Sequence, residues 1–369
     1  MSLSRRSLLA AGLALPASAA LARVPKPQGL GAMLVIDGLG GVGDPYSPED
    51  QMTLSARAIA EIRASGLTAV NQTVAAIGNS PKVWEQAVES LQLYDQFLAS
   101  NPDFMLAVRK ADDFLAAKAQ NKLGLMYCTQ DTSMIGTELD RIAELKAKGV
   151  RQIQLTYNLR NLSGDGALEP ADAGLSRLGH KTIARIEAER VVLDLSHGGA
   201  RTQAEAIAAA TRPPLISHTG CRDLFDHPRN TWDRTMKAVA DKGGAVGIYF
   251  MPYLAAGSKP TGEDLVAHIV HAANVCGHDH VSIGTDGSTI PMVIDDKARE
   301  AARKDWEMRS AAGFAAPGEG PDVFTVVMDY NSIDKYERLA AALQKRGWTM
   351  AQVEKLFGTN LLRVYREVW

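Results

Sequence analysis

The sequence VVLDLSH at residues 191–197 is followed by PPLISH at residues 213–218, and these two stretches decide the fold. Each is a short, mostly apolar run that ends in Ser-His. Runs of this kind are typical of strands buried on both faces, as in a parallel sheet covered by helices. The helical pattern at residues 203–210 lies between them, so the sequence predicts a strand–helix–strand unit.

The same alternation continues in both directions along the chain. Strands are predicted at residues 33–37, 68–73, 122–128, 152–156, 191–195, 214–217, 245–249 and 280–284, with a weaker candidate at 104–108. Helical patterns lie at residues 50–64, 83–100, 136–148, 174–189, 203–210, 234–241 and 262–275. About eight successive strand–helix units predict an α/β protein of the (β/α)8 TIM-barrel type.

An open, nucleotide-binding sheet is the alternative fold for such a pattern. The glycine-rich stretch at residues 38–43 resembles a dinucleotide loop, but a Pro-rich segment follows it where a helix should begin. The sequence therefore favours the closed barrel.

Composition limits the partners of the chain. Lys and Arg total 40 against 42 Asp and Glu, and the formal net charge is −2. Binding to nucleic acid requires a concentrated basic surface, so a nucleic-acid partner is not expected. We expect one barrel domain over residues 23–369, with a lid or insertion at about 288–331 and helices at the C-terminus. The helix start at Thr349 and a helix stop at Gly358 are predicted from capping patterns.

The first residues form a separate segment. SRRSLL at residues 4–9 is a twin-arginine pattern, an apolar run follows, and Ala20-Leu21-Ala22 resembles a signal-peptidase site. We expect residues 1–22 to be a signal peptide for export to the periplasm. No later segment is long and apolar enough to span a membrane, so the mature chain is expected to have no stable membrane span.

Polar residues at the carboxyl ends of the predicted strands indicate the site. His197 and His218 end two consecutive strands, and Asp286 follows the last one. In a barrel these ends meet at one rim, where active sites lie. Neutral imidazoles suit zinc, and a carboxylate beside the ion can take a proton from water. The sequence therefore predicts a metal-dependent hydrolase of the barrel type.

Several long stretches resemble the membrane (renal-type) dipeptidase family, peptidase family M19 of the amidohydrolase superfamily. They are LTYNLRNLSGDGALEPADAGLSRLGH (155–180), VVLDLSHGGART (191–202), PPLISHTGCRDLFDHPRNTWD (213–233), HDHVSIGTD (278–286) and RGWTMAQVEKLFGTNLLRVY (346–365). The resemblance covers nearly the whole mature chain. It implies a (β/α)8 barrel that uses zinc to hydrolyse dipeptides.

The resemblance also implies roles for particular residues. His197 and His218 match the histidines of the family's second metal site, and Asp286 matches the aspartate that contacts the first metal and acts as general acid and base. Arg229, with its neighbour Asn230, matches the segment that binds the substrate carboxylate. Tyr157 stands where animal members have a histidine that polarises the scissile carbonyl, and a phenol can donate the same hydrogen bond.

Other positions depart from the family pattern. The family's His-x-Asp after the first strand is replaced by Leu39 and Gly41, so two ligands are missing. The bridging glutamate aligns with Gln130, with Thr129 or Asp131 as alternatives one residue away. We therefore expect one zinc ion rather than two, bound by His197, His218 and either Asp286, Gln130 or Asp131. A metal-free site and a cryptic two-metal site are the alternatives.

Two functions remain open on these grounds. The first is a metal-dependent, dipeptidase-like hydrolase that cleaves a dipeptide or related amide with a metal-activated water. The second is a non-hydrolytic relative with a degraded metal site, which binds or remodels a peptide-like ligand in the periplasm. In both cases the partner is a small peptide-like molecule, and a homodimer is possible because family members are often dimers.

Overall fold

A parallel sheet forms the centre of the molecule. In a computed structural model the described residues are 30–48, 50–78 and 80–369, so the predicted signal peptide at residues 1–22 lies outside them. Within this part of the chain the strands pair in parallel, in the order β10-β1-β2-β4-β5-β6-β7-β8-β9, with β3 beside β4. Their bounds are β1 Ile36–Gly41, β2 Ala69–Thr73, β3 Met105–Ala107, β4 Leu123–Thr129, β5 Val150–Gln154, β6 Val192–Asp194, β7 Leu215–Thr219, β8 Ala245–Ile248, β9 Val281–Ile283 and β10 Gly287–Ser288.

The sheet closes into a barrel through β10. This short strand continues from β9 and pairs with β1, where Gly40 lies opposite Gly287. The backbone N–H of Asp286, between β9 and β10, donates to the Leu39 carbonyl at 2.8 Å. The α/β barrel predicted from the strand–helix alternation is therefore confirmed. The weaker predicted strand at 104–108 also forms, as β3, but it lies outside the ring.

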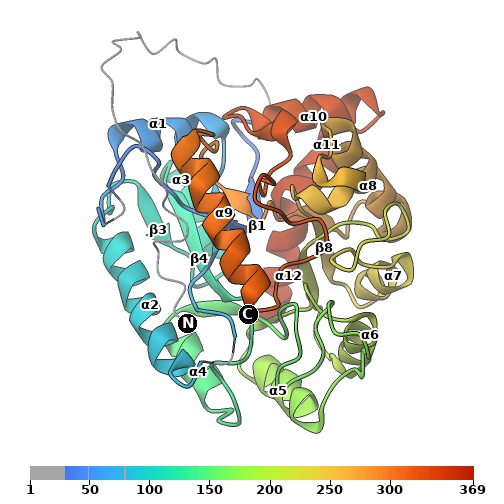
Figure 1. Cartoon of the computed structure of the whole chain (residues 1–369). Helices are drawn as coiled ribbons and strands as arrows, with labels where there is room; N and C mark the ends of the chain where they lie inside the picture. Colours follow the sequence, from blue (N-terminus) through green and yellow to red (C-terminus); the bar gives the residue numbers. More distant parts are fainter. Residues whose placement is uncertain (1–29, 49, 79) are drawn as a thin grey trace.

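Helices surround the strands, and α9 crosses in front of them (Figure 1). Their bounds are α1 Ala56–Ser65, α2 Val83–Ala99, α3 Asp112–Ala119, α4 Arg141–Ala147, α5 Arg177–Ala188, α6 Ala200–Ala209, α7 Asp233–Asp241, α8 Gly262–Cys276, α9 Asp296–Ala311, α10 Lys335–Lys345, α11 Met350–Glu354 and α12 Asn360–Val368. No helix in the described part of the chain is both long and apolar enough to cross a membrane.

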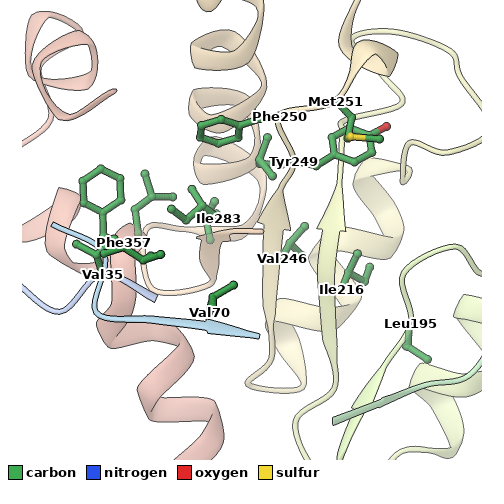
Figure 2. Close-up of a cluster of buried hydrophobic side chains, with 14 of the residues drawn as sticks. Val35, Val70, Leu195, Ile216, Val246, Tyr249, Phe250, Met251, Ile283 and Phe357 are labelled. Carbon is green, nitrogen blue, oxygen red and sulfur yellow. The ribbon is translucent and has the colours of Figure 1, made fainter. Parts of the chain in front are cut away.

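Buried apolar side chains from successive strands pack together with the C-terminal helical segment. Figure 2 shows Ile216, Val246 and Ile283 from β7, β8 and β9 in one cluster that also includes Phe357. Burying each such side chain contributes roughly 1.5–3 kcal/mol relative to leaving it in water. This packing fixes the strand ends, from which the candidate site is built.

The first strand lies further along the chain than predicted. It spans Ile36–Gly41 rather than residues 33–37, so it runs into the glycine-rich stretch. At Gly38 a Cβ atom would lie 2.9 Å from the Ile283 carbonyl oxygen, so only glycine fits this close approach to β9. The buried Asp37 carboxylate then accepts hydrogen bonds from the Thr285 backbone N–H (2.7 Å) and hydroxyl (2.6 Å), which connects β1 to the end of β9.

The C-terminal helices form as predicted at their start but not at their predicted stop. Thr349 and Gln352 make the expected capping box at the beginning of α11. The predicted stop at Gly358 is wrong, because the chain continues through a π-helical turn, Lys355–Thr359, directly into α12. Gly358 is required for a different reason: a Cβ there would lie 2.3 Å from the Leu34 carbonyl oxygen.

Candidate active site

His197, His218 and Asp286 lie together at the carboxyl ends of β6, β7 and β9. The Nε2 atoms of the two histidines are 2.8 Å apart, and Asp286 Oδ2 lies 4.0 Å from His218 Nε2. Both imidazoles are buried, whereas the Asp286 side chain is 21% exposed. The structure thus brings together the three residues that the strand-end pattern singled out.

Backbone strain marks two of these three residues. His197 has a φ of 63° and Asp286 a φ of 55°, both in the left-handed region. Non-glycine residues rarely adopt this conformation, which costs on the order of 1–3 kcal/mol and is concentrated at functional sites. The two strained positions follow the ends of β6 and β9, so the strain turns their side chains into the shared rim.

Outer hydrogen bonds fix how both imidazoles are oriented. His197 Nδ1 lies 2.6 Å from Asn158 Oδ1, an oxygen that only accepts, so Nδ1 carries the proton. His218 Nδ1 lies 2.8 Å from Ser217 Oγ, which itself donates to Asp194 Oδ2 at 2.5 Å. His218 Nδ1 is therefore the donor to Ser217. In neutral rings, both Nε2 atoms then present lone pairs to the same space.

Burial sets the charge of these groups. It lowers the pKa of His197 and of His218 well below the usual value, and the nearby Arg229 guanidinium lowers both further. Burial raises the pKa of Asp286 to about 6, with Arg229 and Arg309 acting in the opposite direction. At neutral pH the site therefore holds two neutral imidazoles, one carboxylate that is mostly ionised, and guanidinium groups beside them.

Arg229 is buried in this cluster with part of its guanidinium unpaired. Its side chain is held next to His197, with Nη2 2.7 Å from His197 Nε2, and its charge lies 5.9 Å from the centre of the Tyr249 ring. Arg229 is only 3% exposed, yet Nη1 has no hydrogen-bond partner among the described residues. A buried guanidinium with a free N–H is suited to bind an anionic ligand.

Tyr157 lies on the other side of His197. Its ring stacks on the imidazole with a centroid separation of 4.1 Å and an interplanar angle of 24°. Its hydroxyl oxygen accepts a hydrogen bond from Arg309 Nη1 at 3.2 Å. Sequence reasoning missed Arg309, because the α9 pattern is charged all round and does not indicate which arginine points inward.

Gln130 is not brought to the histidines by any observed contact. Its amide nitrogen donates to the Thr73 hydroxyl at 2.9 Å, so the side chain extends toward β2. The alternative Asp131 accepts from the backbone of residue 78 and from the Asn161 amide and so holds the loop. Thr129 donates to the Asp131 carbonyl. The structure thus assigns contacts within the fold to all three candidates for the bridging position.

Asn230 is also used within the fold. Its amide nitrogen donates to the carbonyl oxygens of Phe225 (2.9 Å) and Tyr253 (3.0 Å), and its oxygen accepts from the Tyr249 hydroxyl at 2.5 Å. Both amide protons are therefore engaged. Unlike its neighbour Arg229, Asn230 has no free donor for the substrate carboxylate that was predicted to bind there.

Most of the chain matches the model of one protein family. The family model described as membrane dipeptidase (peptidase family M19) matches residues 50–301 and 309–369. The chain belongs to the membrane dipeptidase family. Its resemblance to that family, inferred above from five stretches of sequence, is confirmed.

The chain is also similar to two curated dipeptidases. The chain is 29% identical over 246 residues to dipeptidase verJ of Clonostachys rogersoniana, covering 64% of this chain and 55% of the relative. It is 25% identical over 284 residues to dipeptidase tcpJ of Claviceps purpurea, covering 76% and 59% respectively. The chain thus spans less than two thirds of the length of these relatives.

Solved structures show the same fold. A crystal structure of an amidohydrolase from Pseudomonas aeruginosa matches with a TM-score of 0.77 and 28% identity, covering 92% of this chain and 98% of that one. The probable dipeptidase PvdM from the same organism matches with a TM-score of 0.73 and 18% identity, covering 92% and 96%. The second likeness concerns the fold alone.

Membrane dipeptidases are metal-dependent, and the donors present here fit one ion in part. The two Nε2 lone pairs meet, and both outer nitrogens donate hydrogen bonds, as in metal-binding histidines. However, within residues 30–48, 50–78 and 80–369, no three His, Cys, Asp or Glu side chains are grouped closely enough to hold an ion. Leu39 and Gly41 offer no ligand on β1. The site thus offers two imidazole nitrogens with Asp286 beside them, and these donors do not fit a second ion.

Proposed function

We propose that this membrane dipeptidase hydrolyses a dipeptide or a closely related small amide at the rim formed by His197, His218, Asp286 and Arg229. The observation that carries the proposal is the buried Arg229 guanidinium, whose Nη1 is unpaired next to two neutral imidazoles and a carboxylate. An unpaired buried charge is costly, so this group is expected to be satisfied by the substrate carboxylate. Family membership supports the same reaction class.

The chain's own residues would divide the work as follows. Arg229 binds the terminal carboxylate and sets the scissile amide above the two imidazoles. Tyr157 donates a hydrogen bond from its hydroxyl group to the carbonyl oxygen as negative charge develops there. Asp286, ionised at neutral pH, takes a proton from the attacking water and returns it to the leaving amine.

We further propose a single ion held by His197 and His218, with Asp286 beside it. Zinc, when bound, acidifies water and polarises carbonyl groups. His197 and His218 are suited to hold it because both are neutral and both are oriented by outer hydrogen bonds. Arg229 Nη2, at 2.7 Å from His197 Nε2, competes for the same lone pair, so we expect weaker metal binding than at a site with three ligands.

The test is hydrolysis of a dipeptide panel by the full chain after chelation and after adding back one equivalent of zinc. We expect chelation to abolish cleavage and zinc to restore it, and we expect His197→Ala with His218→Ala to lose both zinc and activity. His180→Ala, at an exposed position on α5, is the matched control and should keep both. Cleavage that survives chelation would overturn the role of the metal, and a panel left uncleaved in the presence of zinc would overturn the hydrolase.

A further inference from the structure

The cover segment, defined as α9 and residues 312–321, lies across the barrel and is held there by polar contacts (Figure 1). None of residues 296–311 is fully buried, so α9 lies outside the apolar core. Hydrogen bonds of the cover segment reach loops at the carboxyl ends of the strands. Arg309 Nη1 donates to the Tyr157 hydroxyl at 3.2 Å, Asn158 Nδ2 donates to the Phe314 carbonyl at 2.7 Å, and His227 Nε2 lies 2.8 Å from the Pro317 carbonyl.

Each barrel residue in these contacts also holds a residue of the candidate site. The Tyr157 ring stacks on His197, and Asn158 Oδ1 accepts from His197 Nδ1. His227 Nδ1 accepts the backbone N–H of Arg229 at 3.2 Å. The cover segment therefore contacts the side chains that orient His197 and Arg229.

Arg309 is the member of the cover segment that reaches the site most directly. Its side chain is 17% exposed, and its Nε and Nη2 atoms make a bidentate pair with Glu319, at 2.9 Å each. Glu319 is held in turn by the Tyr253 hydroxyl at 2.7 Å and the Ala316 N–H at 2.9 Å. Because the planar guanidinium is fixed along this edge, the direction of Nη1 toward Tyr157 is fixed as well.

This contact determines what the Tyr157 hydroxyl can do. A phenol has one proton to donate and an oxygen that can accept. Since Arg309 donates to that oxygen, the Tyr157 proton is left free for another acceptor. The stacking on His197 keeps the ring beside the imidazoles, so the free proton is available to a ligand in the site.

We infer that Arg309 is a positioning residue: it directs the Tyr157 hydroxyl proton into the site, and Glu319 holds Arg309 in place for this task. The inference rests on the proposed function, because only a bound amide gives Tyr157 a carbonyl oxygen to donate to. It also makes the cover segment part of the site.

The first test is a double-mutant cycle on dipeptide hydrolysis by the full chain, with Arg309→Met, Tyr157→Phe and both together. We expect each single change to lower kcat about 10- to 100-fold with KM little changed, since the hydrogen bond to the carbonyl strengthens in the transition state. The double variant should be no slower than Tyr157→Phe alone. Arg303→Met is the matched control, because Arg303 lies on the same helix and pairs only with Glu300 and Glu307 in the contacts observed.

Losses that multiply in the double variant, or an Arg309→Met enzyme with unchanged kcat, would overturn the inference. A general loosening of the cover segment would instead raise KM and persist in the Tyr157→Phe background. The cycle therefore separates a positioning role from a merely structural one.

The second test needs no substrate, so it distinguishes failure of this inference from failure of the proposed function. Fluorine NMR of meta-fluorotyrosine placed at position 157 reports the surroundings of the ring. We expect Arg309→Met and Glu319→Gln to shift the resonance and Arg303→Met to leave it in place. An unshifted resonance overturns the inference whatever the activity. If the resonance shifts but the protein cleaves no dipeptide, the contact between Arg309 and Tyr157 is supported and only the proposed function is overturned.

Discussion

Arg229 is the residue whose substitution should separate binding from chemistry. We expect Arg229→Met to raise KM for dipeptides about 10- to 100-fold, because a hydrogen bond to a charged group contributes roughly 1.5–3 kcal/mol. The matched substrate is a dipeptide with an amide in place of its terminal carboxylate, which wild-type and variant proteins should bind equally poorly. If the substitution raises KM as much for the dipeptide amide as for the dipeptide with a free carboxylate, Arg229 does not bind the carboxylate.

The sequence predicted the site residues that are brought together by strand topology alone. His197, His218 and Asp286 follow parallel strands, so their meeting could be foreseen from strand ends. The orientation of long side chains could not. Gln130 turns toward Thr73, and Arg309 points inward toward Tyr157. Each side chain is oriented by a hydrogen bond to a residue far away in the sequence.

The π-helical turn between α11 and α12 gives a direct test of packing. Gly358→Ala would place a methyl group 2.3 Å from the Leu34 carbonyl. We expect a loss of roughly 1–3 kcal/mol in the free energy of unfolding, measured with urea, despite the better helix propensity of alanine. Gly31→Ala is the control, since nothing lies within 4 Å of that position. Equal stability of the two variants would contradict the close approach.

The same turn shows why element boundaries were harder to predict than elements. Glycine after an apolar run usually ends a helix, and only the position of Leu34 shows that Gly358 serves a close contact instead. The β1 strand was misplaced for a similar reason, because glycines weaken a strand pattern. The short helix α3 was not predicted at all, since its eight residues, Asp112–Ala119, include only two that are buried.

Lys335 joins α10 to the strand that closes the barrel. Its buried ammonium group donates to the Ser288 carbonyl of β10 at 2.8 Å and lies near the buried Asp37. We expect Lys335→Met to lower the free energy of unfolding by about 1–3 kcal/mol, because the hydrogen bond that joins α10 to the Ser288 carbonyl of β10 is lost. Lys345→Met, at the exposed end of α10, should change stability by less than about 0.5 kcal/mol. Matching losses in the two variants would contradict this role.

The pH dependence of the free energy of unfolding gives a second test of Lys335. Burial lowers the pKa of Lys335 to about 8 from an ordinary 10.5. Between these values the unfolded chain holds the proton and the folded chain does not, so the free energy of unfolding attributable to this group rises with pH. The wild-type protein should therefore gain stability relative to Lys335→Met from about pH 8 to pH 10. A constant difference over that range would show that Lys335 keeps its proton.

Asn158 has a consequence for how the protein can accommodate new ligands. Its amide oxygen accepts a hydrogen bond from His197, and its amide nitrogen donates one to the Phe314 carbonyl oxygen. A bulkier ligand that pushes residues 314–317 outward would therefore also disturb the imidazole. Ligand size and reactivity are coupled through a single side chain, so a broader specificity cannot be engineered by lengthening that loop unless both ends of Asn158 keep their partners.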